Sequence, residues 1–241
     1  MARSTPRILA IDVGGTRVKV LLRGQSEVRA VRSGPKMRAS DMVREVRALT
    51  RGWRYDVVAM GYPGVVCHGR PATEPHNLGA GWVGFDYHKA FGHPVRIVND
   101  AAKQAIGSYS GGRMLFLGLG TGLGVAIILN GVLESTEIGH LLYKKDRTYE
   151  DYLGKRGMHR LGHKKWRAAV KDVTERLREA FEVDYVVLGG GNARKLKQLP
   201  PHARLGDNAN AFVGAFRLWL EPNWVRLDIR TRRAGAAMSE K

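Results

Sequence analysis

Residues 8–22 read ILAIDVGGTRVKVLL, and this stretch predicts two short strands joined by a tight glycine turn. The apolar run at 7–13 is typical of a buried strand, and the apolar residues at 18, 20 and 22 alternate along the next one. Gly14, Gly15 and Thr16 form the turn. Because glycine has no Cβ, the backbone N–H groups of such a turn can approach a phosphate closely. The sequence therefore predicts a β-hairpin whose turn can bind phosphate.

Two more glycine runs follow predicted strands, GLGTGLG at 118–124 and GGG at 189–191. They belong to two similar cycles of strands and helices. The first cycle has strands at 7–13, 18–22, 27–31, 57–61 and 95–98, with helices at 41–49, capped by Ser40, and at 101–109. The second has strands at 114–119, 124–129, 132–135 and 185–188, with helices at 164–182 and 207–220. The repeat predicts an α/β protein with a cleft between an N-terminal lobe (1–110) and a C-terminal lobe (111–205). A closing helix (206–220) is expected to pack back between the lobes, followed by a basic C-terminal segment (221–241).

Composition limits the possible partners. The chain has 241 residues, of which 44% are hydrophobic, so it can bury a core. Its 40 Lys and Arg against 22 Asp and Glu give a net charge of +18, which favours nucleic acid or a phosphorylated partner, although a basic surface can also serve solubility alone. The longest aliphatic run, 125–129, is far below the roughly 20 residues of a membrane span, and the N-terminus makes a poor signal peptide. We therefore expect a cytoplasmic protein without a membrane partner.

Several common sites are excluded by their patterns. Cys67 is the only cysteine, so an internal disulfide and a multi-cysteine zinc site are impossible. No frame of the run 118–124 gives the dinucleotide fingerprint G-x-G-x-x-G, and the P-loop pattern occurs nowhere. His159 and His163 are four residues apart with no third ligand nearby, so we expect them to face solvent and expect no zinc.

The motifs together carry a resemblance. The turns at 12–19 and 118–124 and the run at 188–191 resemble the phosphate and adenosine motifs of the sugar kinase/actin superfamily, and within it the chain is similar to the ROK family of sugar kinases. Asn99-Asp100 resembles that family's sugar-binding and catalytic dipeptide, and Glu137-Ile-Gly-His140 resembles its E-x-G-H motif. The resemblance spans about residues 7–220, and the stretch 206–214 is similar to polyphosphate-dependent glucokinases. It implies two actin-like (RNase H-like) lobes, a glucose or related hexose acceptor, a polyphosphate or ATP donor with Mg²⁺, and a homodimer.

The resemblance assigns roles to individual residues. Asp100 is the expected general base, although a residue at the start of a helix can also be a simple cap. The expected sugar ligands are Asn77, Asn99, Asp100, Glu137, His140 and Glu150, with the adjacent Asp151 as the alternative to Glu150. The expected phosphate ligands are Asp12, Gly14, Gly15, Thr16, Lys19, Gly120, Thr121, Gly122, Gly189, Gly190 and Gly191. Asp12 is also expected to order Mg²⁺ through water, because a hard cation prefers oxygen ligands.

The predicted helix at 164–182 has a basic stripe beside its apolar face. Trp166, Val170, Val173, Leu177 and Phe181 share the apolar face, which we expect to be buried. Lys164, Arg167, Lys171 and Arg178 form the stripe, about 21 Å long at the helical rise per residue. Asp172 and Glu175 are expected to lie off it. A row of this length suits a linear polyphosphate, whereas the simpler interpretation is a solvated helix face.

These observations favour a sugar kinase that phosphorylates the 6-hydroxyl of glucose, with mannose as another acceptor, using polyphosphate, ATP or both. An ATP-only kinase for another hexose or amino sugar is one alternative. A non-catalytic regulator that binds sugar or nucleic acid on the same scaffold is the other. Only six residues precede the first predicted strand, which leaves no room for a DNA-binding helix-turn-helix, so nucleic acid is not the favoured partner.

Overall fold

The structure, a computed structural model, describes residues 5–207, 209–221 and 224. It contains two five-stranded sheets, ordered β3-β2-β1-β4-β7 and β10-β9-β8-β13-β14. In each sheet the first three strands are antiparallel and the remaining pairs are parallel. The first comprises β1 (Ile8–Val13), β2 (Arg17–Leu22), β3 (Arg29–Arg32), β4 (Val57–Tyr62) and β7 (Val95–Asn99). The second comprises β8 (Arg113–Leu119), β9 (Leu123–Leu129), β10 (Val132–Thr136), β13 (Tyr185–Gly189) and β14 (Ala203–Leu205). The predicted repeat and the α/β fold class are confirmed.

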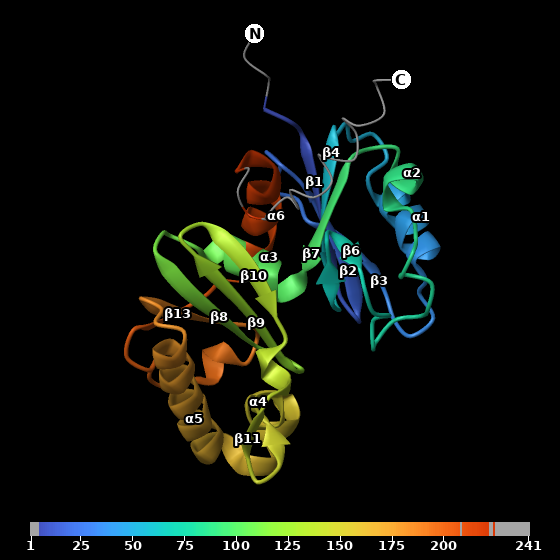
Figure 1. Cartoon of the computed structure of the whole chain (residues 1–241). Helices are drawn as coiled ribbons and strands as arrows, with labels where there is room; N and C mark the ends of the chain where they lie inside the picture. Colours follow the sequence, from blue (N-terminus) through green and yellow to red (C-terminus); the bar gives the residue numbers. More distant parts are fainter. Residues whose placement is uncertain (1–4, 208, 222–223, 225–241) are drawn as a thin grey trace, which may run out of the picture.

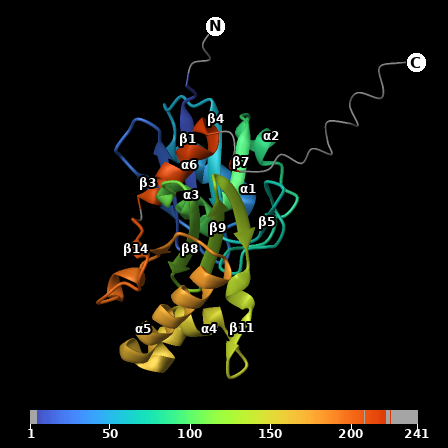
Figure 2. The same ribbon diagram turned by 60° about the vertical axis from the view of Figure 1, so that its left-hand side comes forward.

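Helices cover both faces of each sheet. The helices α3 (Asp100–Ser108) and α6 (Asn210–Leu220) lie between the two sheets, as Figures 1 and 2 show. On the outer sides, α1 (Ala39–Leu49) and α2 (Tyr87–Phe91) pack on the first sheet, and α5 (Lys155–Ala180) packs on the second. We call the first sheet with α1 and α2 the first lobe, and the second sheet with α5 the second lobe.

The alternation of side chains along β1 explains this layering. Ile8 and Ala10 point toward the central core with α3 and α6, whereas Leu9 and Ile11 point toward the outer core beneath α1. Successive residues of a strand face opposite sides, so a strand with apolar residues on both faces must be covered on both. The central core also contains Phe116 of β8 and therefore joins the two sheets.

Two glycines allow α3 and α6 to touch. A Cβ at Gly107 would overlap the carbonyl oxygen of Asn210, and one at Gly214 would overlap the carbonyl oxygen of Lys103. Backbone contact of this kind requires glycine on the approaching face. The close crossing fixes the first turns of α3, which carry Asp100, against the rest of the molecule.

Smaller elements lie in the connections within each lobe. They are the strands β5 (Val66–Cys67), β6 (Arg70–Pro71), β11 (Leu142–Lys144) and β12 (Arg147–Thr148), the helix α4 (Tyr149–Leu153), and the 3₁₀ turns η1 (Ile138–His140) and η2 (Ala193–Lys195). Within the described ranges, no helix combines the length and apolar character needed to cross a membrane. Apart from Glu221 and Trp224, the predicted basic segment at 221–241 lies outside the described residues.

Three predicted helix starts were wrong. The helix α6 begins at Asn210 and not at residue 207. The helix α1 begins at Ala39, so Ser40 lies inside it, and the backbone N–H of Arg38 donates to the Asp41 carboxylate at 3.2 Å instead. The helix α5 begins at Lys155, nine residues before the predicted start, and breaks at Gly162, whose φ of 71° and ψ of 161° are not helical. Because the helix breaks at Gly162, the apolar residues of its first two turns are out of register with those that follow, and the periodic pattern begins only after the break.

Candidate active site

The acid at the junction of β7 and α3 is held by its neighbour. The Asn99 side-chain oxygen accepts hydrogen bonds from the backbone N–H groups of Ala101 (2.8 Å) and Ala102 (3.4 Å), so Asn99 is the N-cap of α3. Its amide group donates to the carbonyl oxygen of Gly64 at 3.0 Å. Asp100 is the first helical residue, and its Oδ1 accepts from Ala101 N–H at 2.7 Å. The capping role therefore falls to Asn99, and the role of Asn99 as a sugar ligand stays a prediction.

The surroundings of Asp100 favour its protonated form. Burial is the largest cause and raises its pKa, and the charges of Asp12 and Glu137 raise it further. The ammonium of Lys103 and the N–H of Ala101 act in the opposite direction but do not cancel the rise. The end of β1 and the E-x-G-H turn thus both act on Asp100. A carboxylate with a raised proton affinity is suited to accept a proton.

Asp12 lies on β1 opposite Lys19 of β2 on one side and Gly61 of β4 on the other. Its Oδ1 receives a hydrogen bond from the Lys103 ammonium at 2.5 Å, and the same ammonium lies 3.4 Å from the carbonyl oxygen of Ile11. The Lys103 side chain is 0% exposed and that of Asp12 is 27% exposed. Burial raises the pKa of Asp12, but the charge and hydrogen bond of Lys103, with a smaller contribution from Lys19, outweigh it and leave that pKa lowered.

The first glycine turn lies between β1 and β2, as predicted. Gly14 N–H donates to the Arg17 carbonyl oxygen at 3.0 Å and closes the turn. A Cβ at Gly15 would lie 2.8 Å from the Cβ of Asn77, so this predicted sugar ligand packs directly on the turn. Thr16 and Lys19 are exposed beside it.

The second and third glycine turns contact each other through a residue that the sequence did not single out. Asn192 donates from its backbone N–H to Leu119 (2.9 Å) and from its side-chain amide to the carbonyl oxygen of Gly120 (3.0 Å). Gly190 has a φ of 80°, and a Cβ there would lie 2.5 Å from the Leu119 carbonyl oxygen. Two predicted groups of phosphate ligands, at 120–122 and 189–191, therefore form one surface of the second lobe. The only available signal was the position of Asn192 directly after the GGG run.

The adjacent acids Glu150 and Asp151 differ in their contacts. Glu150 Oε2 accepts from the backbone N–H of Leu123 at 2.9 Å, and a Cβ at Gly122 would overlap the same oxygen. Asp151 accepts from Thr148 N–H at 3.0 Å and completes a capping box with Thr148, the N-cap of α4. Glu150 is thus the acid that faces the second glycine turn, and its role in sugar binding stays a prediction.

The E-x-G-H turn lies against the second glycine turn as well. A Cβ at Gly139 would lie 2.9 Å from the Leu123 carbonyl oxygen, so glycine is required for this approach. Glu137 Oε2 and His140 Nδ1 are 3.9 Å apart, and their side chains are 52% and 64% exposed. Both side chains are therefore accessible to a ligand, on the side from which the Glu137 charge acts on Asp100.

The apolar face of α5 is confirmed, and its basic stripe is partly paired. Trp166, Val170, Val173 and Leu177 are buried, and Phe181 is partly buried. Lys164 and Lys171 are exposed, and Arg167 and Arg178 are half-buried.

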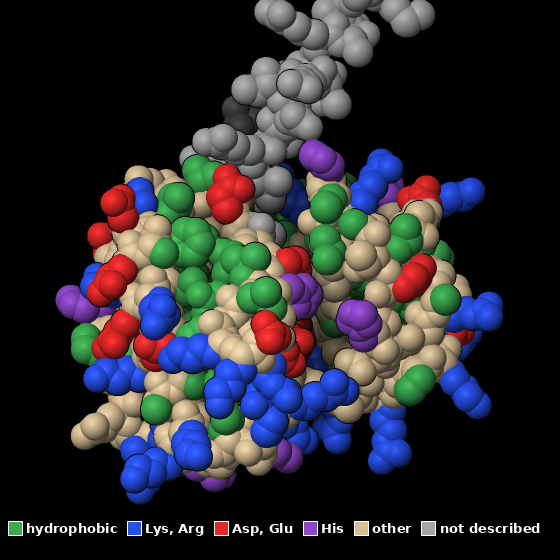
Figure 3. Space-filling model, turned by 60° about the horizontal axis from the view of Figure 1, so that its bottom comes forward, with side chains coloured by type: hydrophobic (Ala, Val, Ile, Leu, Met, Phe, Trp, Pro, Cys, Tyr) green, Lys and Arg blue, Asp and Glu red, His purple; other side chains and the backbone are tan. Residues whose placement is uncertain are grey.

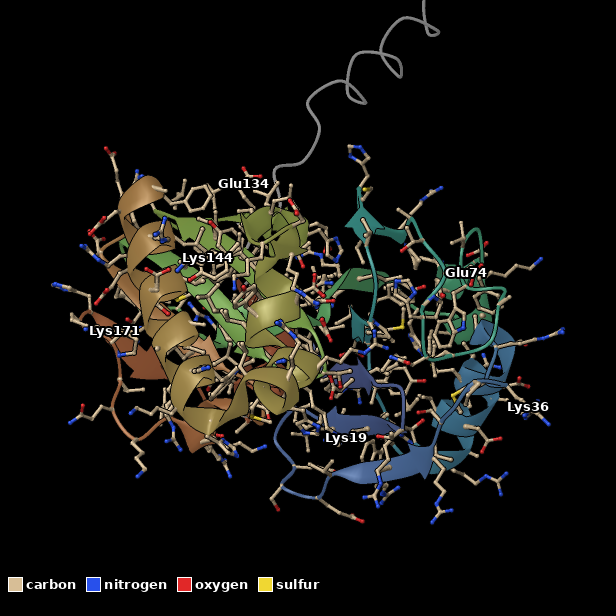
Figure 4. The ribbon with its side chains drawn as sticks, turned by 90° about the horizontal axis from the view of Figure 1, so that it is seen from below. Lys19, Lys36, Glu74, Glu134, Lys144 and Lys171 are labelled. Carbon is tan, nitrogen blue, oxygen red and sulfur yellow. The ribbon has the colours of Figure 1, made fainter. Side chains whose placement is uncertain are left out.

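The stripe has more partners than expected. Lys171 lies 3.9 Å from Glu175, because residues four apart share a helix face, so placing Glu175 off the stripe was wrong. Arg167 donates to the Lys195 carbonyl oxygen at 2.8 Å, and Arg178 lies 3.9 Å from Glu179. Figure 4 shows Lys19 near the junction of the lobes and Lys171 on the outer side of α5. Lys and Arg side chains also form a band across the face in Figure 3, below the hollow between the lobes.

Asp12 is not part of a cluster of metal-ligating side chains within the described residues. Among the residues that the structure describes, no three His, Cys, Asp or Glu side chains gather as they would around a metal ion. Asp12 Oδ1 is already bound to an ammonium group. The role of Asp12 in ordering Mg²⁺ through water stays a prediction, and no catalytic step is assigned to a protein-held metal. His159 and His163 are exposed.

Comparison with known proteins adds to this geometry. The model of the ROK family matches residues 8–159. A polyphosphate glucokinase of Mycobacterium tuberculosis (strain CDC 1551 / Oshkosh) is 31% identical over 164 residues, which cover 62% of this chain and only 61% of that relative. The crystal structure of an inorganic polyphosphate/ATP-glucomannokinase from Arthrobacter sp. strain KM has a TM-score of 0.74 at 22% identity, covering 88% of this chain and 97% of that one. A ROK family glucokinase from Streptomyces griseus in complex with glucose and AMPPNP has a TM-score of 0.66 at 18% identity, covering 89% and 99%. At these identities the solved structures establish the shared fold.

Proposed function

The chain belongs to the ROK family, and we propose that it is a sugar kinase that transfers a phosphoryl group from polyphosphate, ATP or both to the 6-hydroxyl of glucose or mannose. The observation that carries the proposal is the position of Asp100. This acid lies at the start of α3 with a raised pKa, under the influence of Asp12 on the first glycine turn and Glu137 of the E-x-G-H turn. The similarity to a polyphosphate glucokinase supports the choice of acceptor and donor.

The proposed reaction begins with a weak nucleophile. Asp100 accepts the proton of the sugar 6-hydroxyl while the hydroxyl oxygen attacks the terminal phosphorus. The new P–O bond forms as the bond to the remaining phosphate chain breaks, which leaves ADP or a polyphosphate shorter by one unit. Asn77, Glu137, His140 and Glu150 orient the sugar hydroxyls, since their amide, carboxylate and imidazole groups suit vicinal diols. Asn99 sets the position of Asp100 through the helix cap.

The phosphate chain is proposed to lie between the glycine turns of the two lobes. Gly14, Gly15 and Thr16 offer N–H groups from the first lobe, beside the exposed Lys19. The joined turns at 120–122 and 189–191 offer the same groups from the second lobe. We propose that Mg²⁺ accompanies the donor, that the stripe on α5 contacts polyphosphate, and that the enzyme is a cytoplasmic homodimer.

A direct assay tests this proposal. The purified full chain is incubated with glucose, mannose or an amino sugar, and with polyphosphate or ATP at matched ionic strength and Mg²⁺, and the sugar phosphate is quantified. We expect the 6-phosphate of glucose with polyphosphate as donor. Turnover with ATP alone would replace the proposal by an ATP-only kinase. No turnover with any pair, together with sugar-dependent binding of DNA, would replace it by a regulator.

A further inference from the structure

A fully buried lysine occupies the centre of the proposed site and belongs to none of its motifs. Lys103 lies three residues after Asp100 on α3, so the two side chains share one side of the helix. It is among the largest side chains that the fold buries completely. Lysine is rarely buried without a partner, because its ammonium group loses its hydration.

The fold is shaped around this ammonium group. Its Nζ is 2.5 Å from Asp12 Oδ1 and 3.4 Å from the carbonyl oxygen of Ile11, both on β1. On β4, a Cβ at Gly61 would overlap the end of the lysine side chain, with Cε at 2.5 Å and Cδ at 2.9 Å. On the opposite side, Gly214 of α6 lies against the Lys103 backbone carbonyl. Three elements thus fix the lysine, and two of them need glycine to do so.

Stability alone is a weak reason for this arrangement. A buried ion pair rarely stabilises a protein more than apolar residues of similar size would, because both charges lose water. Asp12, however, ends a strand at a turn proposed to bind phosphate, where an uncompensated carboxylate would repel an incoming polyanion. The charge of Lys103 also lowers the pKa of Asp100 against the effect of burial, which shows that its field reaches the second acid of the site.

We propose that Lys103 is a tethered cation of the phosphoryl-transfer site, with its ammonium in the position beside Asp12 that a divalent ion would otherwise occupy. It neutralises Asp12 at every stage of the reaction and offers fixed positive charge to the phosphate donor. The divalent ion is then bound by the phosphate chain and not by Asp12, so this proposal replaces the prediction that Asp12 orders Mg²⁺ through water. This inference rests on the proposed function for its catalytic meaning, whereas the occupation of the cation position can be tested without turnover.

Manganese binding tests the position directly. Free Mn²⁺ is titrated by electron paramagnetic resonance against the wild-type chain, Asp12→Asn, Lys103→Met and the double variant, without sugar or donor. We expect wild type and Asp12→Asn to bind Mn²⁺ equally weakly, and Lys103→Met to gain one site at least tenfold tighter that the double variant loses. A wild-type site removed by Asp12→Asn would overturn the proposal, and so would a folded Lys103→Met without the new site. The first comparison needs no variant of Lys103, so a wild-type site lost in Asp12→Asn would overturn the proposal even if Lys103→Met does not fold.

Chemical rescue tests the charge. Lys103→Ala leaves space for a small alkylammonium ion beside Asp12, whereas Lys103→Met keeps the apolar part of the side chain and vacates only the position of the ammonium group. We expect Lys103→Ala to lower kcat/KM for the donor about a hundredfold with little change in sugar KM. Ethylammonium or propylammonium should raise the kcat/KM of this variant at least tenfold, and propanol should not raise it. Lys36→Ala, at a lysine far from Lys19 in Figure 4, controls for general amine effects. A folded Lys103→Ala that amines do not rescue would overturn the catalytic part of the proposal, whereas an inactive wild-type chain would defeat the proposed function and leave the manganese result standing.

Discussion

Asp100 carries a carboxylate whose pKa is raised mainly by burial, and this has consequences for the pH dependence of the proposed reaction. A general base works in its ionised form, so kcat/KM should fall as the pH drops through the raised pKa, at a higher pH than an ordinary aspartate would give. Asp100→Asn should reduce kcat by roughly 10²–10⁴-fold, the usual contribution of general base catalysis. Isothermal titration should show that glucose binding persists, and retained turnover would contradict the role.

For the same substitution, the raised pKa also predicts the sign of the change in the free energy of unfolding. A folded-state pKa above the unfolded value means that ionisation of Asp100 costs stability. The cost is absent below the unfolded pKa and develops as the pH rises through the folded one. Asn can keep the contact with Ala101 N–H without the charge. Asp100→Asn should therefore be at least as stable as wild type at pH 7, with a smaller difference near pH 3. Urea unfolding at both pH values measures this, and a loss of stability at pH 7 would contradict it.

Sequence reasoning found residues with local signals and missed those with distant partners. Asp100 was predictable because a strand, an Asn-Asp pair and a small-residue helix follow each other directly. Lys103 has no such signal, since it lies among alanines and its partner Asp12 is 91 residues away in the chain. Asn192 was missed for a related reason: its amide bonds Gly120, 72 residues earlier. Contacts of this kind depend on how the two lobes fold and pack.

At the scale of elements, the basic stripe on α5 is proposed to favour polyphosphate over ATP. Lys164→Glu, Arg167→Glu and Lys171→Glu together should raise the KM for polyphosphate by about tenfold or more, since each exposed charge contact contributes up to ~1 kcal/mol. The KM for ATP should change much less, because ATP is shorter than the stripe. Steady-state kinetics with both donors at one ionic strength measures this. Lys36→Glu, Arg47→Glu and Arg51→Glu, all exposed on the first lobe, make a control of equal charge.

One residue of the stripe needs separate treatment. Arg167 donates to the backbone at Lys195, so its reversal can also disturb the link between α5 and η2. The double variant Lys164→Glu, Lys171→Glu keeps that hydrogen bond. Its KM for polyphosphate should still rise more than its KM for ATP. An equal loss with both donors in the double variant would refute a polyphosphate role for this helix.

Elements were predictable where the hydrophobic period was unbroken. The strands β1, β8 and β9 lie within a residue of their predicted ends. Glycines interrupt the apolar pattern on both sides of β8 and β9, and polar residues before β1 and glycines after it do the same there. The start of α5 was not predictable from periodicity, because Gly162 leaves helical geometry. Ser40 was a reasonable cap by type, but the chain enters the helix one residue earlier.

At the scale of the whole molecule, the central core determines whether the two lobes unfold together or separately. It contains Ile8 and Ala10 of the first sheet, Met114 and Phe116 of the second, and residues of α3 and α6 between them. Loss of either sheet would expose the apolar side of both helices. The two lobes should therefore not unfold separately, although each also has an outer core of its own.

Two buried tryptophans report on those outer cores. Trp82 belongs to the core of the first lobe and Trp166 to that of the second, and both are 0% exposed. With 5-fluorotryptophan in the full chain, which has five tryptophans, the ¹⁹F resonances of Trp82 and Trp166 can be assigned with Trp82→Phe and Trp166→Phe and followed in one urea titration of the wild-type sequence. Coincident transitions are the mark of two-state unfolding, and we expect one shared midpoint because the core around α3 and α6 loses packing from both sides at once. Separate midpoints would mean that the outer cores are independent and that α3, with Asp100 and Lys103, stays folded on one lobe alone.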